Sequence, residues 1–328
     1  MVLLDPYKRS INYLRISVTD RCNLRCLYCV AHNDIPKLRH EEILRYEEIL
    51  RIARVGTRLG IRKIRVTGGE PLVRKGIVNF LRNLSSLKGL EDIGLTTNAI
   101  LLEQNLQDIW DAGIHRLNIS LDTLDRDKYQ FITGLDGLTR VLGAIGEAER
   151  LGFNPIKINM VVMENINDHE VEAFARISLD RPYHVRFIEY MPIGSQPGHL
   201  KPSYIPTEAI MRRLEKIGPL EPVKRDRNDG PAQRYRFPGA RGEIGFISPM
   251  TNHFCATCNR LRLTAEGKLR PCLLSDKEID IKSAIRSGAT DEELASIFQK
   301  AILLKPKAHG LLQDSSHLFP GEMSSIGG

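Results

Sequence analysis

The sequence has no long apolar run, no run of lysine and arginine, and few cysteines. No window approaches the roughly 18 consecutive apolar residues of a transmembrane helix, so we expect no membrane span. The opening segment, residues 1–6, lacks a sustained apolar stretch and a small-residue cleavage site, which is not typical of a signal peptide. We therefore expect a cytoplasmic protein.

The charge is spread along the chain rather than concentrated. Lys and Arg total 47 against 40 Asp and Glu, which gives a formal net charge of +7. A nucleic-acid-binding protein usually carries a basic run or tail, so we expect no nucleic-acid partner. A dispersed excess of this size is equally compatible with binding of a small polyanion. The length of 328 residues suggests about two domains.

The six cysteines form two groups, an N-terminal trio (Cys22, Cys26 and Cys29) and a C-terminal trio (Cys255, Cys258 and Cys272). Six disulfide-forming cysteines are uncommon in a reducing cytoplasm, whereas clustered cysteines are typical of metal ligands. The two trios are therefore the first candidates for a functional site.

The first two-thirds of the chain alternates strand-like and helix-like segments. The predicted strands are Asn12–Val18, Arg62–Thr67, Asp92–Thr97, Arg116–Leu121, Pro155–Val162 and His184–Tyr190. The predicted helices are Glu41–Leu59, Gly76–Leu87, Leu102–Ala112, Leu138–Leu151 and His169–Ser178. Six strands alternating with helices predict an α/β fold with a parallel sheet, either a partial (β/α)6 TIM-like barrel or a doubly wound sheet.

Alternation within the strands favours the barrel. The first strand sets Leu14 and Ile16 on one face against Arg15 on the other, and Arg65 and Lys157 lie on the polar faces of later strands. A doubly wound sheet is covered by helices on both faces, so its central strands should be apolar on both. One repeatedly polar face instead predicts a barrel whose interior holds a ligand, with the chemistry at the C-terminal ends of the strands.

A change in composition marks the end of the alternating region. Residues 192–206 are rich in Pro, Gly and Ser, and residues 224–232 form a second polar stretch. A predicted helix, Thr207–Ile217, lies between them, and further short strands (Arg234–Phe237, Glu243–Ile247 and Leu261–Thr264) and two helices follow. We place the boundary near residue 220, with a partial barrel over residues 1–220 and a smaller C-terminal domain over residues 221–328.

The N-terminal trio follows the first predicted strand directly, with the spacing C-x₃-C-x₂-C. Three thiolates on one loop can bind three irons of a four-iron cluster and leave the fourth iron open for a ligand. The alternative is a zinc site completed by His32, although structural zinc ligands usually come as pairs from two separate knuckles.

The C-terminal trio has the spacing C-x₂-C-x₁₃-C. On its own, this spacing predicts a Cys₃His zinc site with His253, and a second iron–sulfur cluster is the alternative. Arg260 and Arg262 lie two residues apart on a predicted strand and face the same way, and guanidinium pairs suit phosphate oxygens. The alternative for this pair is a solvated surface position.

These segments together resemble the radical S-adenosylmethionine (radical SAM) superfamily. Besides the cysteine loop after the first strand, Thr67–Pro71 follows the second strand as the superfamily's GGEP motif does. The resemblance implies that the open iron binds the amino and carboxylate groups of SAM and that its reductive cleavage gives a 5′-deoxyadenosyl radical. Glycines in such a loop let the backbone approach a bound ligand closely.

Within that superfamily the chain resembles the GTP 3′,8-cyclase family of molybdenum cofactor biosynthesis. The match runs from about Tyr13 to Leu274 and resumes at Met323–Gly328, and its distinguishing parts are the C-x₂-C-N-R-L-R-L-T segment and the terminal Ile-Gly-Gly. The resemblance implies two [4Fe-4S] clusters, one on each trio. It implies SAM contacts at Tyr28, Gly69, Ser120 and Met191. It implies GTP contacts at Arg15, Lys63, Arg65, Thr96, Lys157, Arg186, Arg260, Leu261 and Arg262.

The resemblance also implies a reaction, in which the radical abstracts the ribose 3′ hydrogen of GTP and the ribose radical attacks C8 of guanine. Gly327 and Gly328 would reach into the barrel and position this reaction, whereas a diglycine end is ordinarily frayed. The implied partners are GTP, a reduced electron donor and the cyclic pyranopterin monophosphate synthase that takes the product, and a homodimer remains open.

Two alternatives remain at this point. One is a radical SAM enzyme with an auxiliary cluster and a different substrate. The other is a zinc-bearing RNA-binding or regulatory protein that uses its basic residues for phosphates. The second alternative requires an exposed basic stripe, whereas the cations lie on a strand face that should line a cavity.

Overall fold

The structure is a computed structural model, and it describes residues 2–29, 37–191, 203–224, 230–309 and 326. Its strands are β1 (Tyr13–Ser17), β2 (Lys63–Thr67), β3 (Asp92–Thr97), β4 (Leu117–Ser120), β5 (Ile156–Val162), β6 (His184–Glu189), β7 (Glu221–Pro222), β8 (Gln233–Arg236), β9 (Glu243–Ile247), β10 (Arg260–Leu263), β11 (Lys268–Arg270) and β12 (Ile279–Asp280). Its helices are α1 (Tyr46–Leu59), α2 (Ile77–Ser85), α3 (Leu106–Asp111), α4 (Arg126–Thr133), α5 (Leu138–Arg150), α6 (Val171–Asp180), α7 (Thr207–Leu214), α8 (Lys282–Arg286) and α9 (Asp291–Leu303).

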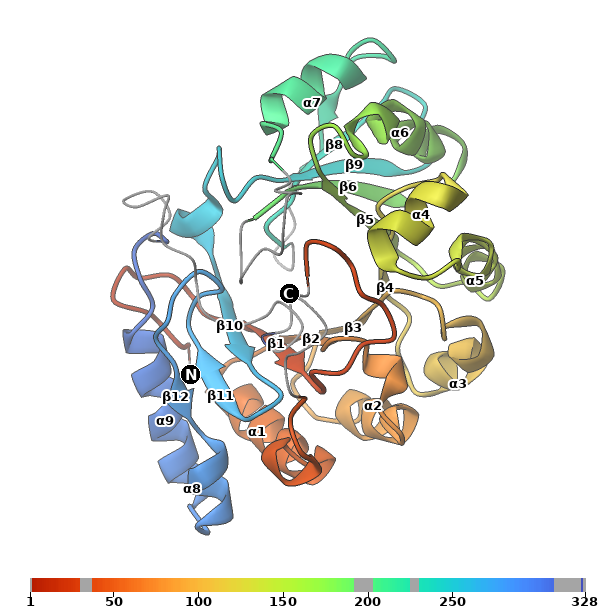
Figure 1. The fold of residues 1–328 in the computed structure, drawn as a ribbon. Coiled ribbons are helices and arrows are strands. Elements are labelled where there is room, and N and C mark those ends of the chain that lie inside the picture. Colours follow the sequence, from red (N-terminus) through yellow and green to blue (C-terminus); the bar gives the residue numbers. More distant parts are fainter. Residues whose placement is uncertain (1, 30–36, 192–202, 225–229, 310–325, 327–328) are drawn as a thin grey trace.

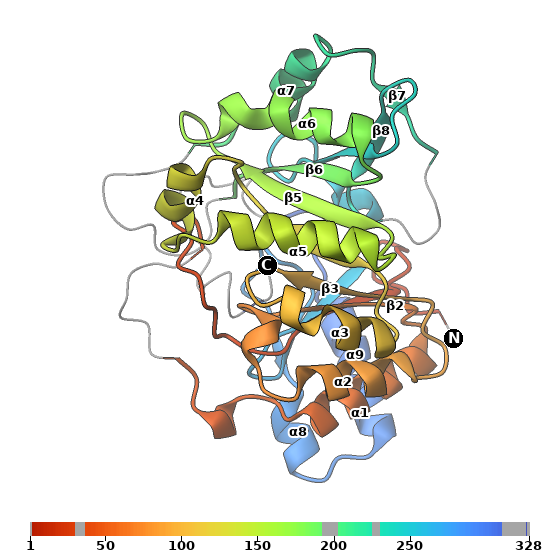
Figure 2. The same cartoon turned by 90° about the vertical axis from the view of Figure 1, so that its right-hand side faces the viewer.

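The first six strands form the predicted open barrel. Strands β1 to β6 pair in sequence order and all run parallel, and Figure 1 shows them curving around a central space with the helices outside. Figure 2 shows α1, α2, α3 and α5 covering the outer side of the sheet. The apolar residues Leu14 and Ile16 of β1 are fully buried in the core under these helices, while Arg15 faces the interior. The prediction of a partial barrel is confirmed.

The strands after residue 220 do not form a separate sheet. Strand β10 pairs in parallel with β1, and β9 pairs in parallel with β6, so one twelve-stranded sheet carries C-terminal strands at both ends of the barrel. The hydrophobic core is also continuous, because Phe246 and Leu261 belong to the same cluster as Leu14. The proposed boundary at 220 therefore separates segments of sequence that pack together as one body.

Several helical segments differ from the predictions in their bounds, and α1 and α4 differ most. The predicted helix from Glu41 begins instead at Tyr46, after a short 3-10 turn, because the Glu48 carboxylate accepts a hydrogen bond from the Arg45 backbone N–H at 2.6 Å and caps α1 there. Helix α4 was not predicted at all. It begins where the Asp125 side chain accepts a hydrogen bond from the Lys128 backbone N–H at 2.7 Å.

Candidate active site

One cavity of about 310 Å³ occupies the barrel interior and is lined by residues from both ends of the sheet. All six cysteines line it, although the two trios are separated by more than 220 positions in the sequence. The pairing of β10 with β1 explains this, because Cys258 lies two residues before β10 while the N-terminal trio follows the other end of β1. The cavity therefore has one trio towards each end.

The N-terminal trio is held by backbone contacts with the loop after β2. Gly69 donates its backbone N–H to the Thr19 carbonyl at 2.7 Å, and Glu70 donates to the Arg21 carbonyl at 2.8 Å. A Cβ on Gly69 would overlap the carbonyl oxygen of Arg21, so glycine is required for these two loops to pack. The contact of this glycine with SAM stays a prediction, and the structure shows that it packs against the cysteine loop.

Buried polar groups surround the N-terminal trio. The Asn98 side chain donates to Cys22 Sγ at 3.7 Å, and the Leu24 backbone N–H donates to the same atom at 3.4 Å. Burial raises the pKa of the Cys26 thiol well above its ordinary value, and the neighbouring Cys29, Asp122 and Cys22 raise it further. A positive metal centre would relieve this cost, because it stabilises the thiolate form.

Tyr28 is fixed at the edge of the same loop. Its hydroxyl donates to Asp122 Oδ2 at 2.7 Å, and Asp122 Oδ1 accepts from the Val161 backbone N–H at 2.8 Å. These bonds connect the cysteine loop to the ends of β4 and β5. Ser120 and Met191 line the cavity as well, so the four residues expected to contact SAM lie around one space.

The C-terminal trio lies against β10 and the segment after α9. The Arg260 guanidinium hydrogen-bonds to Cys258, and although burial raises the pKa of that thiol, Arg260 and Lys305 outweigh burial and lower it to about 6. The His253 and His309 rings lie beside the trio, with His309 Nε2 at 2.9 Å from His253 Nδ1.

The thiols of each trio interact electrostatically with one another, so the three cysteines of each trio lie close together in the folded chain. Among the residues that the structure describes, no three Cys, His, Asp or Glu side chains are close enough to hold a single metal ion. Three cysteine thiols on one side of a cavity fit the ligand set of a four-iron cluster that leaves one iron open. His32, the fourth ligand of the zinc alternative, lies outside the described residues.

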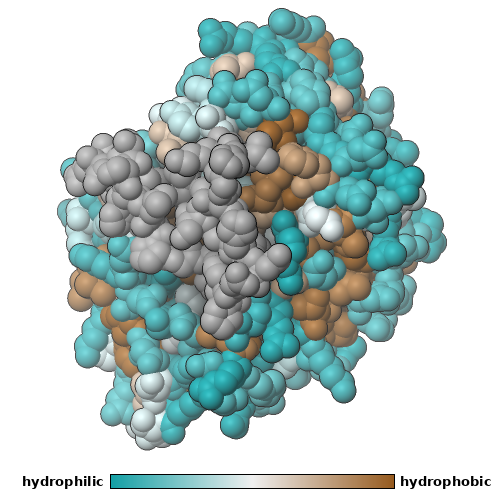
Figure 3. Space-filling view, viewed as in Figure 1, coloured by the Kyte–Doolittle hydropathy of each residue, from teal (hydrophilic) through white to brown (hydrophobic). Residues whose placement is uncertain are grey.

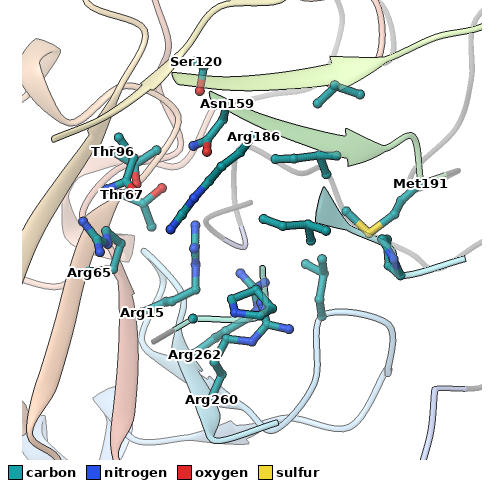
Figure 4. Close-up of a pocket in the computed structure, with 18 of the residues that line it drawn as sticks. Arg15, Arg65, Thr67, Thr96, Ser120, Asn159, Arg186, Met191, Arg260 and Arg262 are labelled. Carbon is teal, nitrogen blue, oxygen red and sulfur yellow. The ribbon is translucent and has the colours of Figure 1, made fainter. Parts of the chain in front are cut away.

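The cations form rows across adjacent strands. Arg262 of β10, Arg15 of β1 and Arg65 of β2 are register partners on three neighbouring strands. Neighbouring strands lie about 4.8 Å apart, so three like charges stand side by side, which is destabilising unless an anion lies among them. Figure 4 shows Arg15 and Arg186 pointing into the same space from different strands, with Arg260 and Arg262 beside them.

These cations are also buried, which increases the energetic cost of placing them together. Arg65 is 3% exposed, Arg262 4% and Lys157 6%. Burial, together with Arg186, Arg65, Arg116 and Lys63, lowers the pKa of Lys157 to about 5, so its amine is neutral at pH 7. The lowered pKa reflects the excess of positive charge buried in this cavity, and an excess of that sign suits an anionic ligand.

Gly94 makes room for one of these cations. It is the register partner of Arg65 on β3, and a Cβ at this position would overlap the Nη1 atom of Arg65. The Arg65 side chain thus passes over Gly94 and extends into the cavity. Glycine is required here by a side chain rather than by backbone conformation.

The structure brings together almost all of the predicted contact residues. Arg15, Lys63, Arg65, Thr96, Lys157, Arg186, Arg260 and Arg262 line the cavity, as do Tyr28, Gly69, Ser120 and Met191. Leu261 is the exception, because its side chain points into the hydrophobic core. Gly327 and Gly328 lie outside the described residues, but the preceding Ile326 packs in a cluster with Leu274, Met191 and Cys272 beside the cavity.

Among the cavity residues that the sequence analysis did not name, Tyr13 and Lys305 contact the predicted site residues directly. Tyr13 hydrogen-bonds to both Arg15 and Arg65. Burial raises its pKa, but Arg65, Arg15 and Lys63 outweigh burial and lower it to about 7. Its position two residues before Arg15 placed it on the same strand face, which was the available signal. Lys305 had no such signal, because it comes from beyond α9 and meets β10 only through folding.

Comparison with known proteins decides the family. Residues 16–177 match the family model of the radical SAM superfamily, and residues 183–311 match that of Molybdenum Cofactor Synthesis C. The chain is 49% identical to the GTP 3′,8-cyclase of Moorella thermoacetica and 51% identical to that of Thermodesulfovibrio yellowstonii, with 99% of each chain covered. The chain belongs to the GTP 3′,8-cyclase family.

The fold comparison agrees with this family. Streptococcus suis SuiB bound to S-adenosylmethionine matches with a TM-score of 0.64 and 15% identity, over 96% of this chain and 78% of SuiB. At this identity the likeness concerns the fold alone. Our identification of the radical SAM superfamily and of the cyclase family from the sequence is confirmed.

On the face in Figure 3, hydrophilic residues cover most of the surface of the described residues, with patches of apolar residues between them. Within the described ranges, none of the helices has both the length and the apolar character needed to cross a bilayer. Arg65, Arg262 and Lys157 lie inside the cavity rather than on an exposed stripe, which disfavours the RNA-binding alternative.

Proposed function

We propose that this protein converts GTP to (8S)-3′,8-cyclo-7,8-dihydroguanosine 5′-triphosphate, the first step of molybdenum cofactor biosynthesis. The observation that carries the proposal is the single cavity, which has three thiols towards each end and a row of buried cations between them. The family relationship supplies the reaction, and the cavity supplies a site of matching chemistry.

We assign the two cysteine trios to two [4Fe-4S] clusters. The N-terminal trio would hold the cluster that binds SAM, with Tyr28, Gly69, Ser120 and Met191 around the cofactor. When bound, this cluster and SAM supply a 5′-deoxyadenosyl radical. The C-terminal trio would hold a second cluster whose open iron faces the guanine of GTP.

The protein's own residues orient the two reactants. The hydrogen bond to Asp122 fixes the orientation of the Tyr28 ring, so a SAM molecule beside the cluster would pack against a ring that is already in place. The row of Arg262, Arg15 and Arg65 would bind the triphosphate, and the register of β10, β1 and β2 fixes its direction. Holding both reactants in one geometry is a large part of what a protein contributes to such a reaction.

The finer assignments complete the proposal. A low-potential reduced donor would deliver electrons, and a cyclic pyranopterin monophosphate synthase would receive the product. We propose a cytoplasmic location. Gly327 and Gly328 would extend from Ile326 towards the reacting atoms.

The experiment that tests the function is turnover by anaerobically reconstituted protein given SAM, GTP and dithionite, with products identified by mass spectrometry. We expect 5′-deoxyadenosine and the cyclised nucleotide from the wild type. Cys26→Ala should form neither, whereas Cys258→Ala should lose the cyclised nucleotide. Release of 5′-deoxyadenosine with all GTP returned unchanged would overturn the proposed substrate.

A further inference from the structure

Lys305 follows α9 and is buried, with 4% of its surface exposed. Its ammonium donates hydrogen bonds to two backbone carbonyls, that of Arg260 at 2.7 Å and that of Pro271 at 2.7 Å. Arg260 lies two residues after Cys258, and Pro271 immediately precedes Cys272. One side chain therefore ties together the two chain segments that carry two of the three C-terminal thiols.

The surroundings of Lys305 are rich in thiols. Burial and the cations Arg260 and Arg9 lower its pKa, whereas Cys258 and Cys272 raise it. The groups whose negative charge stabilises this ammonium are thus two cysteine ligands. Backbone carbonyl oxygens carry only a partial negative charge, so two of them do not neutralise a buried ammonium. The positive charge of Lys305 therefore acts on the two cysteine ligands.

Arg9 makes a comparable contact but is neutralised. Its Nη1 atom donates to the Cys255 carbonyl at 2.6 Å, and its Nε atom donates to Asp5 Oδ2 at 2.5 Å. Arg9 therefore holds the third cysteine in place with its charge already balanced. Lys305 differs, because the groups that raise its pKa are both thiols.

We infer that Lys305 is a positioning residue that holds the cradle of the second cluster and raises its reduction potential by its charge. This inference rests on the proposed assignment of an iron–sulfur cluster to the C-terminal trio. Reduction of a cluster adds one negative charge, and a buried cation stabilises the more negative state. Net charge, burial and hydrogen bonding near the sulfurs are the established controls of cluster potential.

The test is a redox titration of the second cluster, followed by electron paramagnetic resonance in the full-length protein. Cys22, Cys26 and Cys29 are replaced by Ala in every sample, so that only the second cluster is reduced. Lys305→Gln keeps hydrogen-bond donors without charge, and Lys305→Arg keeps both. Lys307→Gln is the matched control, because Lys307 is exposed and lies two residues away.

We expect Lys305→Gln to shift the midpoint potential to a more negative value, while Lys305→Arg and Lys307→Gln stay close to the parent. A Gln variant that fails to load iron beside a fully loaded Arg variant also supports a requirement for the charge. Equal potentials in the Gln variant and the parent would overturn the inference, as would equal shifts, or equal loss of iron, in the Gln and Arg variants. Absence of the second cluster from the parent would refute the cluster assignment itself.

Discussion

Binding of GTP should draw a proton into the barrel, and Lys157 should be the group that takes it up. In the structure the pKa of Lys157 is about 5, so at pH 8 only about one amine in a thousand is protonated. A triphosphate among the arginines reverses the repulsion that lowers this pKa. The ammonium form then becomes favoured, and one proton enters with the nucleotide.

The magnitude follows from the size of the shift. Half-protonation at pH 8 requires the pKa of Lys157 to rise by about three units, which corresponds to about 4 kcal/mol. A unit charge at about 4 Å supplies about 4 kcal/mol at an effective dielectric constant near 20. One phosphate contact therefore suffices, and two or more should bring the uptake at Lys157 close to one proton.

Calorimetric titration of GTP in HEPES and in Tris measures this uptake, because the two buffers differ in ionisation enthalpy. At pH 8 the wild type should take up about one proton more than Lys157→Met. Since the pKa of Lys157 is lower before GTP binds than after, affinity for GTP should fall as the pH rises towards the pKa that Lys157 has in the complex. The slope should be shallower in the variant. Tyr13→Phe separates any proton uptake at Tyr13, whose pKa is about 7 in the structure. Equal proton uptake by the wild type and Lys157→Met would refute the reasoning.

Three further predictions concern the substrate end of the cavity. Gly94→Ala should displace the Arg65 guanidinium and weaken GTP binding at least about tenfold by equilibrium titration, whereas Gly143→Ala, which meets nothing within 4 Å, should not. Arg262→Ala should weaken GTP by about ten- to hundredfold but guanosine far less, and equal losses would place Arg262 away from the phosphates. Deletion of Gly327–Gly328 should leave iron content and GTP affinity intact while the cyclised product disappears; normal product formation would show that the tail is only a chain end.

The sequence allowed accurate prediction of the barrel strands because their signal is local. Alternation placed Arg15, Arg65 and Lys157 on the interior face, and β3 and β9 were predicted to the residue. The alternation of apolar and polar residues along a strand depends only on which face of the strand meets the core. It can therefore be recognised without knowing which strands are its partners. The same argument makes Tyr13 recoverable, since it shares the face of Arg15.

The parts that could not be predicted depend on long-range pairing. The sequence does not indicate that β10 pairs with β1 or that β9 pairs with β6. Either edge of the six-stranded barrel could have accepted any C-terminal strand. The row of Arg262, Arg15 and Arg65 arises only from this pairing. Helix α4 was missed for a different reason. Its short, polar sequence has weak apolar periodicity, and only Asp125 at its N-cap marks its start.

The central claim is that the cavity brings the SAM-derived radical to the ribose of GTP, and transfer of a label tests it most directly. GTP carrying deuterium at C3′ is incubated anaerobically with SAM, dithionite and the reconstituted protein, and 5′-deoxyadenosine is analysed by mass spectrometry. We predict that 5′-deoxyadenosine contains one deuterium atom and that the cyclised nucleotide has lost it. Unlabelled 5′-deoxyadenosine, formed while the deuterium stays in the nucleotide, would contradict the account.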